Sequence, residues 1–317
     1  MPKTAVIALG GNSLIRDARS RQRLADQSEI IRNICGQVVE LLADGWGVVL
    51  VHGNGPQLGQ TLQRSELSRE FVEDLPLDLA IADTQACLGH LFQQTLGNAM
   101  RARGLKGHAV ALVTQVEVDA ADAAFSNPVK AVGYFMDEST ATYRREEDGW
   151  QVTEDAGRGW RRLVPFPKPR SVVEFEVIRQ LAVSGSCVIC AGGGGIPVIS
   201  TDAGLVSTTA VVDKDLTAIL LAHQLQADLL LFCAVPEKLF LNPNTSESRP
   251  LSRLTVDEAR SYLAEGHFRS GSLRPKVESG LHFVESTRGR VVITNPAHLL
   301  DGARSLAGTE IVPVEPG

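Results

Sequence analysis

The sequence lacks an excess of positive charge. Its 31 Lys and Arg residues are outnumbered by 37 Asp and Glu, which gives a formal net charge of −6 at pH 7. Proteins that bind nucleic acid or anionic membranes through their overall field carry a basic surface. The charge balance therefore argues against both kinds of partner, and any anionic ligand has to be met by a few local cations.

Long apolar runs are also missing. No stretch is long enough to span a bilayer, and the N-terminal residues lead directly into a strand-like run without a signal-type segment. We therefore expect a cytoplasmic protein.

With 317 residues, of which 44% are hydrophobic and 21% charged, the chain can bury the core of one large α/β domain or of two lobes.

Cysteines are few, and two common nucleotide motifs are absent. The five cysteines, an odd number, lie mostly in apolar runs, which favours reduced core thiols over a disulfide framework. Cys187 and Cys190 have the spacing of a redox or metal motif, but residues three apart in a strand point to opposite faces, so we predict no metal ligands there. Neither a Walker motif nor a Gly-x-Gly-x-x-Gly after the first strand is present, which disfavours those two nucleotide folds.

Segments typical of buried strands alternate with segments typical of helices. This alternation predicts parallel βαβ units and an open α/β sheet. The predicted strands are 4–9, 47–52, 109–114, 186–191, 228–232 and 290–294. Four helices are predicted at 23–44, 78–103, 172–184 and around 214–222. Three more are predicted: one from a capping box at 255–258 to about 265, one that starts near 275, and a short one after the last strand.

Three predicted strands run directly into glycines, in Gly10-Gly11-Asn12, Gly53-Asn54-Gly55 and the run 192–195. Glycines there let the backbone approach a ligand, and the following N–H groups can hold phosphate oxygens at the carboxyl edge of the sheet. We interpret the first two turns as two walls of one crevice, although tight turns chosen for backbone reasons alone are the alternative. The run of four glycines is hardest to explain by structure alone, so we expect it to touch a ligand.

Lys214 is predicted in the first turn of a helix that Asp213 or Asp215 caps. A lysine there opposes the positive end of the helix dipole, so it is better placed to meet an anion than to stabilise the helix. It is a candidate phosphate ligand, and a solvated lysine beside two acids is the alternative.

His52 and His267 are candidate general bases, but a packed or hydrogen-bonded role is favoured for both.

Residues 120–169 interrupt the alternation and are richer in Pro, Gly, charged and aromatic residues. We predict an insertion that projects from the sheet, in the manner of a lid, and that carries Lys130, Arg158, Arg161 and Arg162. The acidic run 146–148 within it should be a solvated hairpin or loop tip.

Segments from nearly the whole chain, taken together and in order, resemble the carbamate kinases of the amino-acid kinase family. They are Ala8-Leu-Gly-Gly-Asn12, His52-Gly-Asn-Gly-Pro-Gln57, Asn127-Pro-Val-Lys130, Glu154-Asp-Ala-Gly-Arg-Gly-Trp-Arg-Arg162, Gly192-Gly-Gly-Gly-Ile-Pro197, Val212-Asp-Lys-Asp-Leu216, Glu265-Gly-His-Phe268 and Pro275-Lys276.

This resemblance implies a fold and an activity. The fold is an α/β/α sandwich with a mainly parallel sheet, in which an N-terminal lobe, 1–184, binds the small acid and pairs as a homodimer. A C-terminal lobe, 185–317, binds ATP or ADP. The implied reaction moves a phosphoryl group between carbamoyl phosphate and ADP with Mg²⁺.

The resemblance also implies roles for single residues. The residues that would hold the carbamate and the transferring phosphoryl group are Gly10, Gly11, Asn12, Gly53, Asn54 and Gly55. Four residues would carry the chemistry. Lys130 would close over that group, Lys214 and Lys276 would neutralise phosphate charge, and Asp215 would hold the lysines in place. Those that would contact the nucleotide are Gly193, Gly194, Asp213, Lys214, Ala234 and Lys276.

Three segments differ from the family's pattern. Ala131 replaces a proline after Lys130, and Arg274 replaces a glycine before Pro275-Lys276. Ala234 and Pro236 stand where the family usually has two aspartates near the nucleotide. These differences keep two alternatives open: a catalytically weak relative that acts as a binding or complex-forming subunit, and a kinase of another small carboxylate or carbamate.

Overall fold

The computed structural model describes residues 3–15, 24–234, 236–243, 245–268, 273–287 and 289–313. The predicted first residue of the helix at Arg23, the turn at Gly271 and the last residues of the polar tail lie outside the described residues. None of the helices in these ranges combines the length and the apolar character that crossing a bilayer requires.

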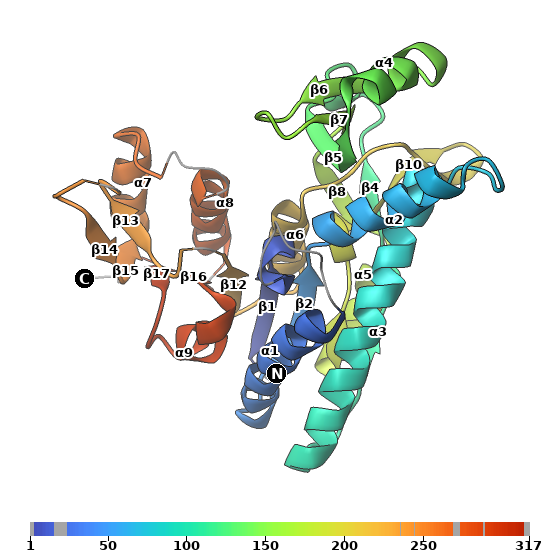
Figure 1. Ribbon diagram of the computed structural model, residues 1–317. Coiled ribbons are helices and arrows are strands. Elements are labelled where there is room, and N and C mark those ends of the chain that lie inside the picture. The colour runs from blue at the N-terminus through green and yellow to red at the C-terminus, as the bar shows by residue number, and fades with distance from the viewer. Residues whose placement is uncertain are drawn as a thin grey trace.

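An eight-stranded sheet forms the centre of the molecule (Figure 1), in the order β15-β17-β16-β12-β1-β2-β9-β3. Every neighbouring pair is parallel except β16 and β17. The strands are β1 (Thr4–Leu9), β2 (Gly47–His52), β3 (Ala109–Ala111), β9 (Cys187–Ile189), β12 (Leu229–Cys233), β15 (Arg253–Thr255), β16 (Arg290–Thr294) and β17 (Thr309–Val312). The mainly parallel sheet is confirmed, and β3 is shorter than predicted.

Helices cover both faces of this sheet, because its central strands carry apolar side chains on both sides. One layer consists of α1 (Leu24–Ala43), α3 (Leu77–Arg103) and α9 (Leu299–Ala303). The other consists of α5 (Phe175–Val183), α6 (Lys214–Gln224), α7 (Val256–Ala264) and α8 (Leu273–Ser286). The three-layer α/β/α sandwich is therefore confirmed.

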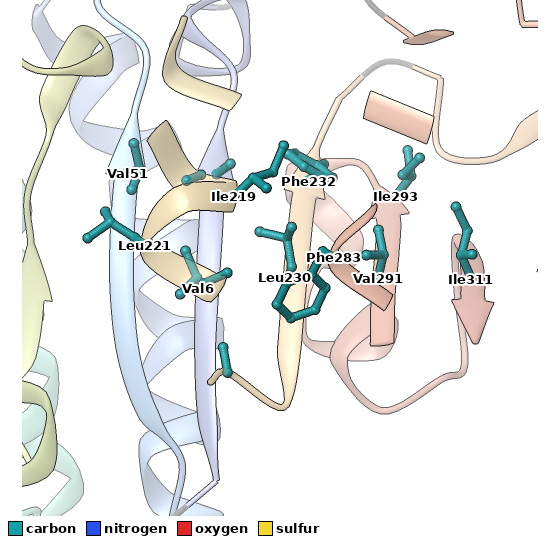
Figure 2. Packing of buried hydrophobic residues seen from close by; sticks show 14 of the residues in the cluster. Val6, Val51, Ile219, Leu221, Leu230, Phe232, Phe283, Val291, Ile293 and Ile311 are labelled. Carbon is teal, nitrogen blue, oxygen red and sulfur yellow. The ribbon is translucent and has the colours of Figure 1, made fainter. Parts of the chain in front are cut away.

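The two cores divide alternate residues of each strand between them. In β1, Val6 packs in the core under α6 and α8, as Figure 2 shows, whereas Ile7 packs in the core under α1 and α3. Cys187 and Cys190 belong to opposite cores, as their spacing predicts. The capping box that opens α7 at Thr255 and Glu258 is also confirmed.

The insertion projects from the main body (Figure 1), as predicted. It contains β5 (Lys130–Met136), α4 (Glu138–Glu147), β6 (Gln151–Glu154) and β7 (Trp160–Val164), with η2 (Ala123–Phe125) before them. A second sheet, in the order β11-β10-β4-β8, lies at its base and comprises β4 (Gln115–Val118), β8 (Pro169–Val172), β10 (Ile196–Thr201) and β11 (Gly204–Ser207). Other elements are a hairpin of β13 (Leu239–Leu241) and β14 (Arg249–Leu251), and the short helices η1 (Gly11–Leu14), η3 (Gly192–Gly194) and η4 (Pro296–His298).

The prediction of a solvated hairpin or loop tip at 146–148 is confirmed for the solvent exposure of Glu146 and Glu147, but it is wrong for their secondary structure and for Asp148. The first two of these acids end α4, and Asp148 accepts hydrogen bonds from Arg69 at 2.9 and 3.1 Å and from Arg144 at 2.6 Å. Arg144, which is 1% exposed, also pairs with Glu66. Because Glu66 belongs to α2 (Gly55–Ser68), these ion pairs tie the projecting insertion to that helix.

Candidate functional site

A cavity of about 450 Å³ lies where β1, β2 and β12 end, between the sheet and the insertion. It is the position at which open α/β sheets hold ligands. Every residue predicted for the site lines this cavity except Gly194. The lining includes Gly10, Gly11, Asn12, Ser13, Gly53, Asn54, Gly55, Lys130, Arg161, Phe166, Gly193, Asp213, Lys214, Asp215, Ala234 and Lys276.

The first two glycine turns are in contact. A Cβ on Gly53 would lie 2.4 Å from the backbone nitrogen of Gly11, so only glycine allows this approach. The N–H of Gly53 donates to Leu9 at 2.8 Å, and the N–H of Gly10 donates to Cys233 at 3.2 Å. These bonds join the ends of three neighbouring strands, and the predicted single crevice is confirmed.

The run of four glycines has a packing explanation, contrary to our expectation. Gly193, Gly194 and Gly195 have φ angles of 71°, 100° and 97°, in the region that favours glycine. A Cβ on Gly192 would lie 2.5 Å from His52, and one on Gly194 would lie 2.2 Å from the Val212 carbonyl oxygen. Gly193 alone of these four lines the cavity, so the run is required by the fold whether or not a ligand touches it.

His52 is a packed core residue, as favoured from the sequence. It is 1% exposed, stacks on Phe92 at a centroid distance of 5.9 Å, and its Nδ1 lies 3.3 Å from the carbonyl oxygen of Gly53. Burial lowers the pKa of His52 to about 4, although the bond to Gly53 opposes the shift. The imidazole is therefore neutral at pH 7 and supports the glycine turns.

This burial predicts a pH dependence of stability. An unfolded histidine has a pKa of about 6.5, so between about pH 6.5 and pH 4 the unfolded chain binds a proton that folded His52 does not. Stability should fall with decreasing pH across this window, by on the order of 3 kcal/mol in total. His52→Gln should remove this component from the thermal midpoints measured between pH 7 and 4.5, whereas His223→Gln, at an exposed position of α6, should not. An unchanged slope in His52→Gln would contradict the assignment.

Two lysines share one carboxylate at the start of α6. Asp213 caps the helix, accepting from the N–H groups of Asp215 at 2.7 Å and Leu216 at 3.3 Å, which decides between the two predicted caps. Asp215 pairs with Lys214 through Oδ1 and with Lys276 of α8 through Oδ2, at 2.9 Å in the second pair. The Lys276 side chain is 5% exposed and the other two are 14% exposed.

The two ammonium groups decide the charge of Asp215. Burial alone would raise its pKa, but Lys214 and Lys276 outweigh burial and hold the pKa below its ordinary value. Asp215 is therefore ionised, and the three groups together carry one net positive charge. This charge lies at the N-terminus of α6, where the helix dipole is also positive.

Lys130 faces these groups from the first residue of β5. Its ammonium lies 4.3 Å from the centroid of the Phe166 ring, within the range of a cation–π contact. Partial removal from water lowers the pKa of Lys130, and the Asp213 carboxylate opposes that shift. Arg161 lines the same side and donates to the Gly133 carbonyl oxygen at 3.4 Å. Neither Phe166 nor Arg161 was predicted as a site residue from the sequence. The cluster of cationic residues in 120–169 could have indicated Arg161.

The end of β12 differs from the other strand ends. Ala234 lines the cavity and donates its N–H to Thr294 at 2.6 Å, but it brings no carboxylate. Glu237 lies 3.3 Å from Nδ1 of His298 on η4, outside the lining.

Among the described residues no group of three or more His, Cys, Asp and Glu could hold a metal ion.

The cavity as a whole suits a phosphate group. The N-termini of α2 and α6 border it, glycine turns form its floor, and three lysines from separate segments surround it. Phosphoryl transfer asks a protein mainly for positioning and for cations around developing negative charge. The site therefore has the parts of a phosphotransferase.

Comparison with known proteins agrees with this class. The chain belongs to the amino acid kinase family, whose sequence profile matches residues 3–295. It is 40% identical over 316 residues to the carbamate kinase of Pyrococcus horikoshii, covering 99% of this chain and 100% of that protein. It is 41% identical over 316 residues to the carbamate kinase-like protein YahI of Escherichia coli, covering 98% and 99%. Within the family, the chain thus groups with the carbamate kinases.

A solved structure gives the same result. The carbamate kinase from Giardia lamblia bound to AMP-PNP superposes with a TM-score of 0.91 at 34% sequence identity, and the match covers 99% of both chains. The amino-acid kinase fold and the class of phosphotransferase predicted from the sequence are therefore confirmed.

Proposed function

We propose that this chain transfers a phosphoryl group between carbamoyl phosphate and ADP, forming carbamate and ATP. The observation that carries the proposal is the joining of Lys214 and Lys276 through Asp215, in the same cavity as the contact between the turns at Gly11 and Gly53. Two cations fixed beside a floor of backbone N–H groups can hold a phosphoryl group between a small acid and a nucleotide. The full-length similarity to carbamate kinases supports the same substrate pair.

In this proposal each segment has one task. Gly10, Gly11 and Asn12 of the first turn, with Gly53, Asn54 and Gly55 of the second, hold the carbamate and the phosphoryl group. Lys214 and Lys276 stabilise the charge that develops on the transferring oxygens, and Asp215 fixes the positions of both ammonium groups. Lys130 lines the same cavity from the insertion.

We further propose that the nucleotide enters beside Gly193, Asp213 and Ala234, where Gly194 supports the turn through its packing on Val212. The structure of the Giardia enzyme with AMP-PNP supports nucleotide binding in this fold. Magnesium commonly binds one or two carboxylates together with substrate phosphates. Asp213 fits this role because Asp215 already pairs with two lysines, and magnesium bound there would neutralise phosphate charge.

A coupled assay of ATP formation from carbamoyl phosphate and ADP with Mg²⁺ tests the function. We expect turnover that requires all three components. Turnover with acetyl phosphate but not carbamoyl phosphate would instead identify a kinase of another small carboxylate. If calorimetry detects nucleotide binding but the assay detects no turnover, the chain would be a complex-forming subunit instead. The absence of the family's two aspartates at Ala234 and Pro236 favours this alternative.

Lys130→Ala should lower kcat at least about a hundredfold, since it removes one charge-stabilising group from the site. The affinity for ADP should stay within about twofold, because Lys130 lies on the insertion and the ADP pocket is proposed in the other lobe. The exposed Lys168 of the same insertion provides the control, and Lys168→Ala should leave both values unchanged. An equal loss of ADP affinity and turnover in Lys130→Ala would contradict this geometry.

The division into lobes at 184/185 and the homodimer remain predictions, as does the cytoplasmic location. The eight-stranded sheet is continuous across the proposed boundary, since β9 pairs with β2 and β3. Analytical ultracentrifugation of the purified chain would measure the oligomeric state directly.

A further inference from the structure

The side chain of Asn54 is bonded to a helix other than the one it begins. Asn54 occupies the N-cap position of α2, where an asparagine normally accepts a hydrogen bond from an N–H of the first turn. Here its Nδ2 donates to Oγ1 of Thr84, on α3, at 2.8 Å, and its side chain makes no capping bond to the described residues of α2. Both residues are buried, with 7% and 2% of their surface exposed.

The hydroxyl of Thr84 fixes which way the Asn54 amide faces. Thr84 has one hydroxyl hydrogen, which it donates to the carbonyl oxygen of Ile81 at 2.7 Å. Its oxygen is therefore left to accept, and the group of Asn54 that meets it must be the NH₂. Oδ1 of Asn54 is consequently on the edge of the amide away from Thr84.

Gly193 fixes the plane of the same amide. A Cβ on Gly193 would lie 2.3, 2.6 and 2.7 Å from Nδ2, Cγ and Oδ1 of Asn54, so the glycine backbone lies against the face of the group. The amide is thus held at one edge by Thr84 and on one face by Gly193. Asn54 and Gly193 both line the cavity, whereas Thr84 does not.

Among the residues that the structure describes, this arrangement leaves the first turn of α2 without a side-chain acceptor. Pro56, the second residue of the helix, has no N–H, and the N–H of Leu58 already bonds to the Asn54 carbonyl oxygen at 2.8 Å. The donor that a capping asparagine would satisfy is therefore the N–H of Gln57. In the observed orientation the Asn54 side chain makes no bond to this N–H, and Gly55 and Pro56 of the same turn line the cavity, so this end of the helix faces an anion bound there.

We propose that Thr84 is a positioning residue for the phosphotransferase site: it diverts Asn54 from capping α2, which keeps the helix N-terminus available to the substrate anion. The proposal rests on the proposed function, because it assigns that anion to carbamoyl phosphate. A purely structural Thr84 would stabilise the fold and affect both substrates alike. A positioning Thr84 affects the small acid selectively.

Thr84→Val removes the hydroxyl with little change of shape, and Thr84→Ser keeps the hydroxyl. We expect Thr84→Val to lower kcat/KM for carbamoyl phosphate about tenfold, with KM for ADP within about twofold and the thermal midpoint unchanged or raised, because Asn54 becomes free to cap α2. Thr84→Ser should restore kcat/KM to within about twofold of the parent chain. Equal kcat/KM in the Val and Ser variants, or equal losses for both substrates with a lower midpoint, would overturn the proposal.

Two further measurements isolate the route through Asn54. In an Asn54→Ala background, Thr84→Val should cost less than about twofold more, since both changes act on one group. In the ligand-free protein, hydrogen exchange at the Gln57 amide should slow in Thr84→Val, because Oδ1 of Asn54 can then accept from it. Unchanged exchange at Gln57 overturns the role of Thr84, whereas a parent chain inactive on carbamoyl phosphate overturns the proposed function, so the two failures are distinguishable.

Discussion

Lys214→Ala should reduce kcat at least about a thousandfold while the fold stays intact, since it removes a fixed positive charge from the transferring group. Lys214 opposes the dipole of α6, and Asp215 keeps its second partner, Lys276, at 2.9 Å. The free energy of unfolding should therefore change by less than about 1 kcal/mol. Steady-state kinetics and thermal unfolding of the same preparation measure both values.

Two variants serve as controls for this result. Lys214→Arg should also impair turnover, because a planar guanidinium does not replace a compact ammonium that pairs with Asp215 in a fitted site. Lys106→Ala, at an exposed position between α3 and β3, should have no effect on turnover. Activity of Lys214→Ala within about tenfold of the parent chain would refute the phosphate-binding role of this residue.

Asp215→Asn should produce the second large effect, and it should affect both stability and activity. Asparagine keeps the shape of the side chain but leaves two buried ammonium groups without their shared carboxylate. Removing one member of such a buried ionic group costs about 3 kcal/mol of stability. Turnover should fall by about two to three orders of magnitude, because both lysines lose the shared carboxylate that helps to fix their positions.

The pH dependence separates this charge effect from simple repacking. The pKa of Asp215 is lowered in the folded chain, so its stabilising contribution is present above the ordinary aspartate pKa and is lost as pH falls through the folded value. The difference in thermal midpoint between the parent chain and Asp215→Asn should therefore be large at pH 7 and shrink in strong acid. A difference independent of pH would show that the lost interaction is not ionic.

Much of the site was predictable because its residues carry local signals. The glycine turns at Gly10 and Gly53 follow apolar strand runs, and parallel strands end at one edge of a sheet, so their meeting follows from topology. Asp213 and Lys214 stand at the start of an apolar helical pattern, which fixes the cap and the exposed helix end.

Other features depend on contacts that no local pattern contains. The helix α2 was not predicted, because Gly53-Asn54-Gly55-Pro56 has the composition of a turn, and proline is equally suited to the first turn of a helix. Asp148 has the appearance of a solvated acid until Arg69, distant in sequence, is placed beside it. Four successive glycines suggested a ligand, but backbone angles and the neighbouring side chains explain most of the run.

The order in which the cavity's residues occur along the chain affects its synthesis. Lys276, on α8, shares the carboxylate of Asp215 and lies late in the chain, whereas the floor at Gly10 and Gly11 comes from the first strand. During translation the floor emerges from the ribosome before Asp215, and the ammonium group of Lys276 emerges after both. A nascent chain that ends before α8 therefore has an incomplete charge cluster, and the proposed site is complete only after α8 has been synthesised.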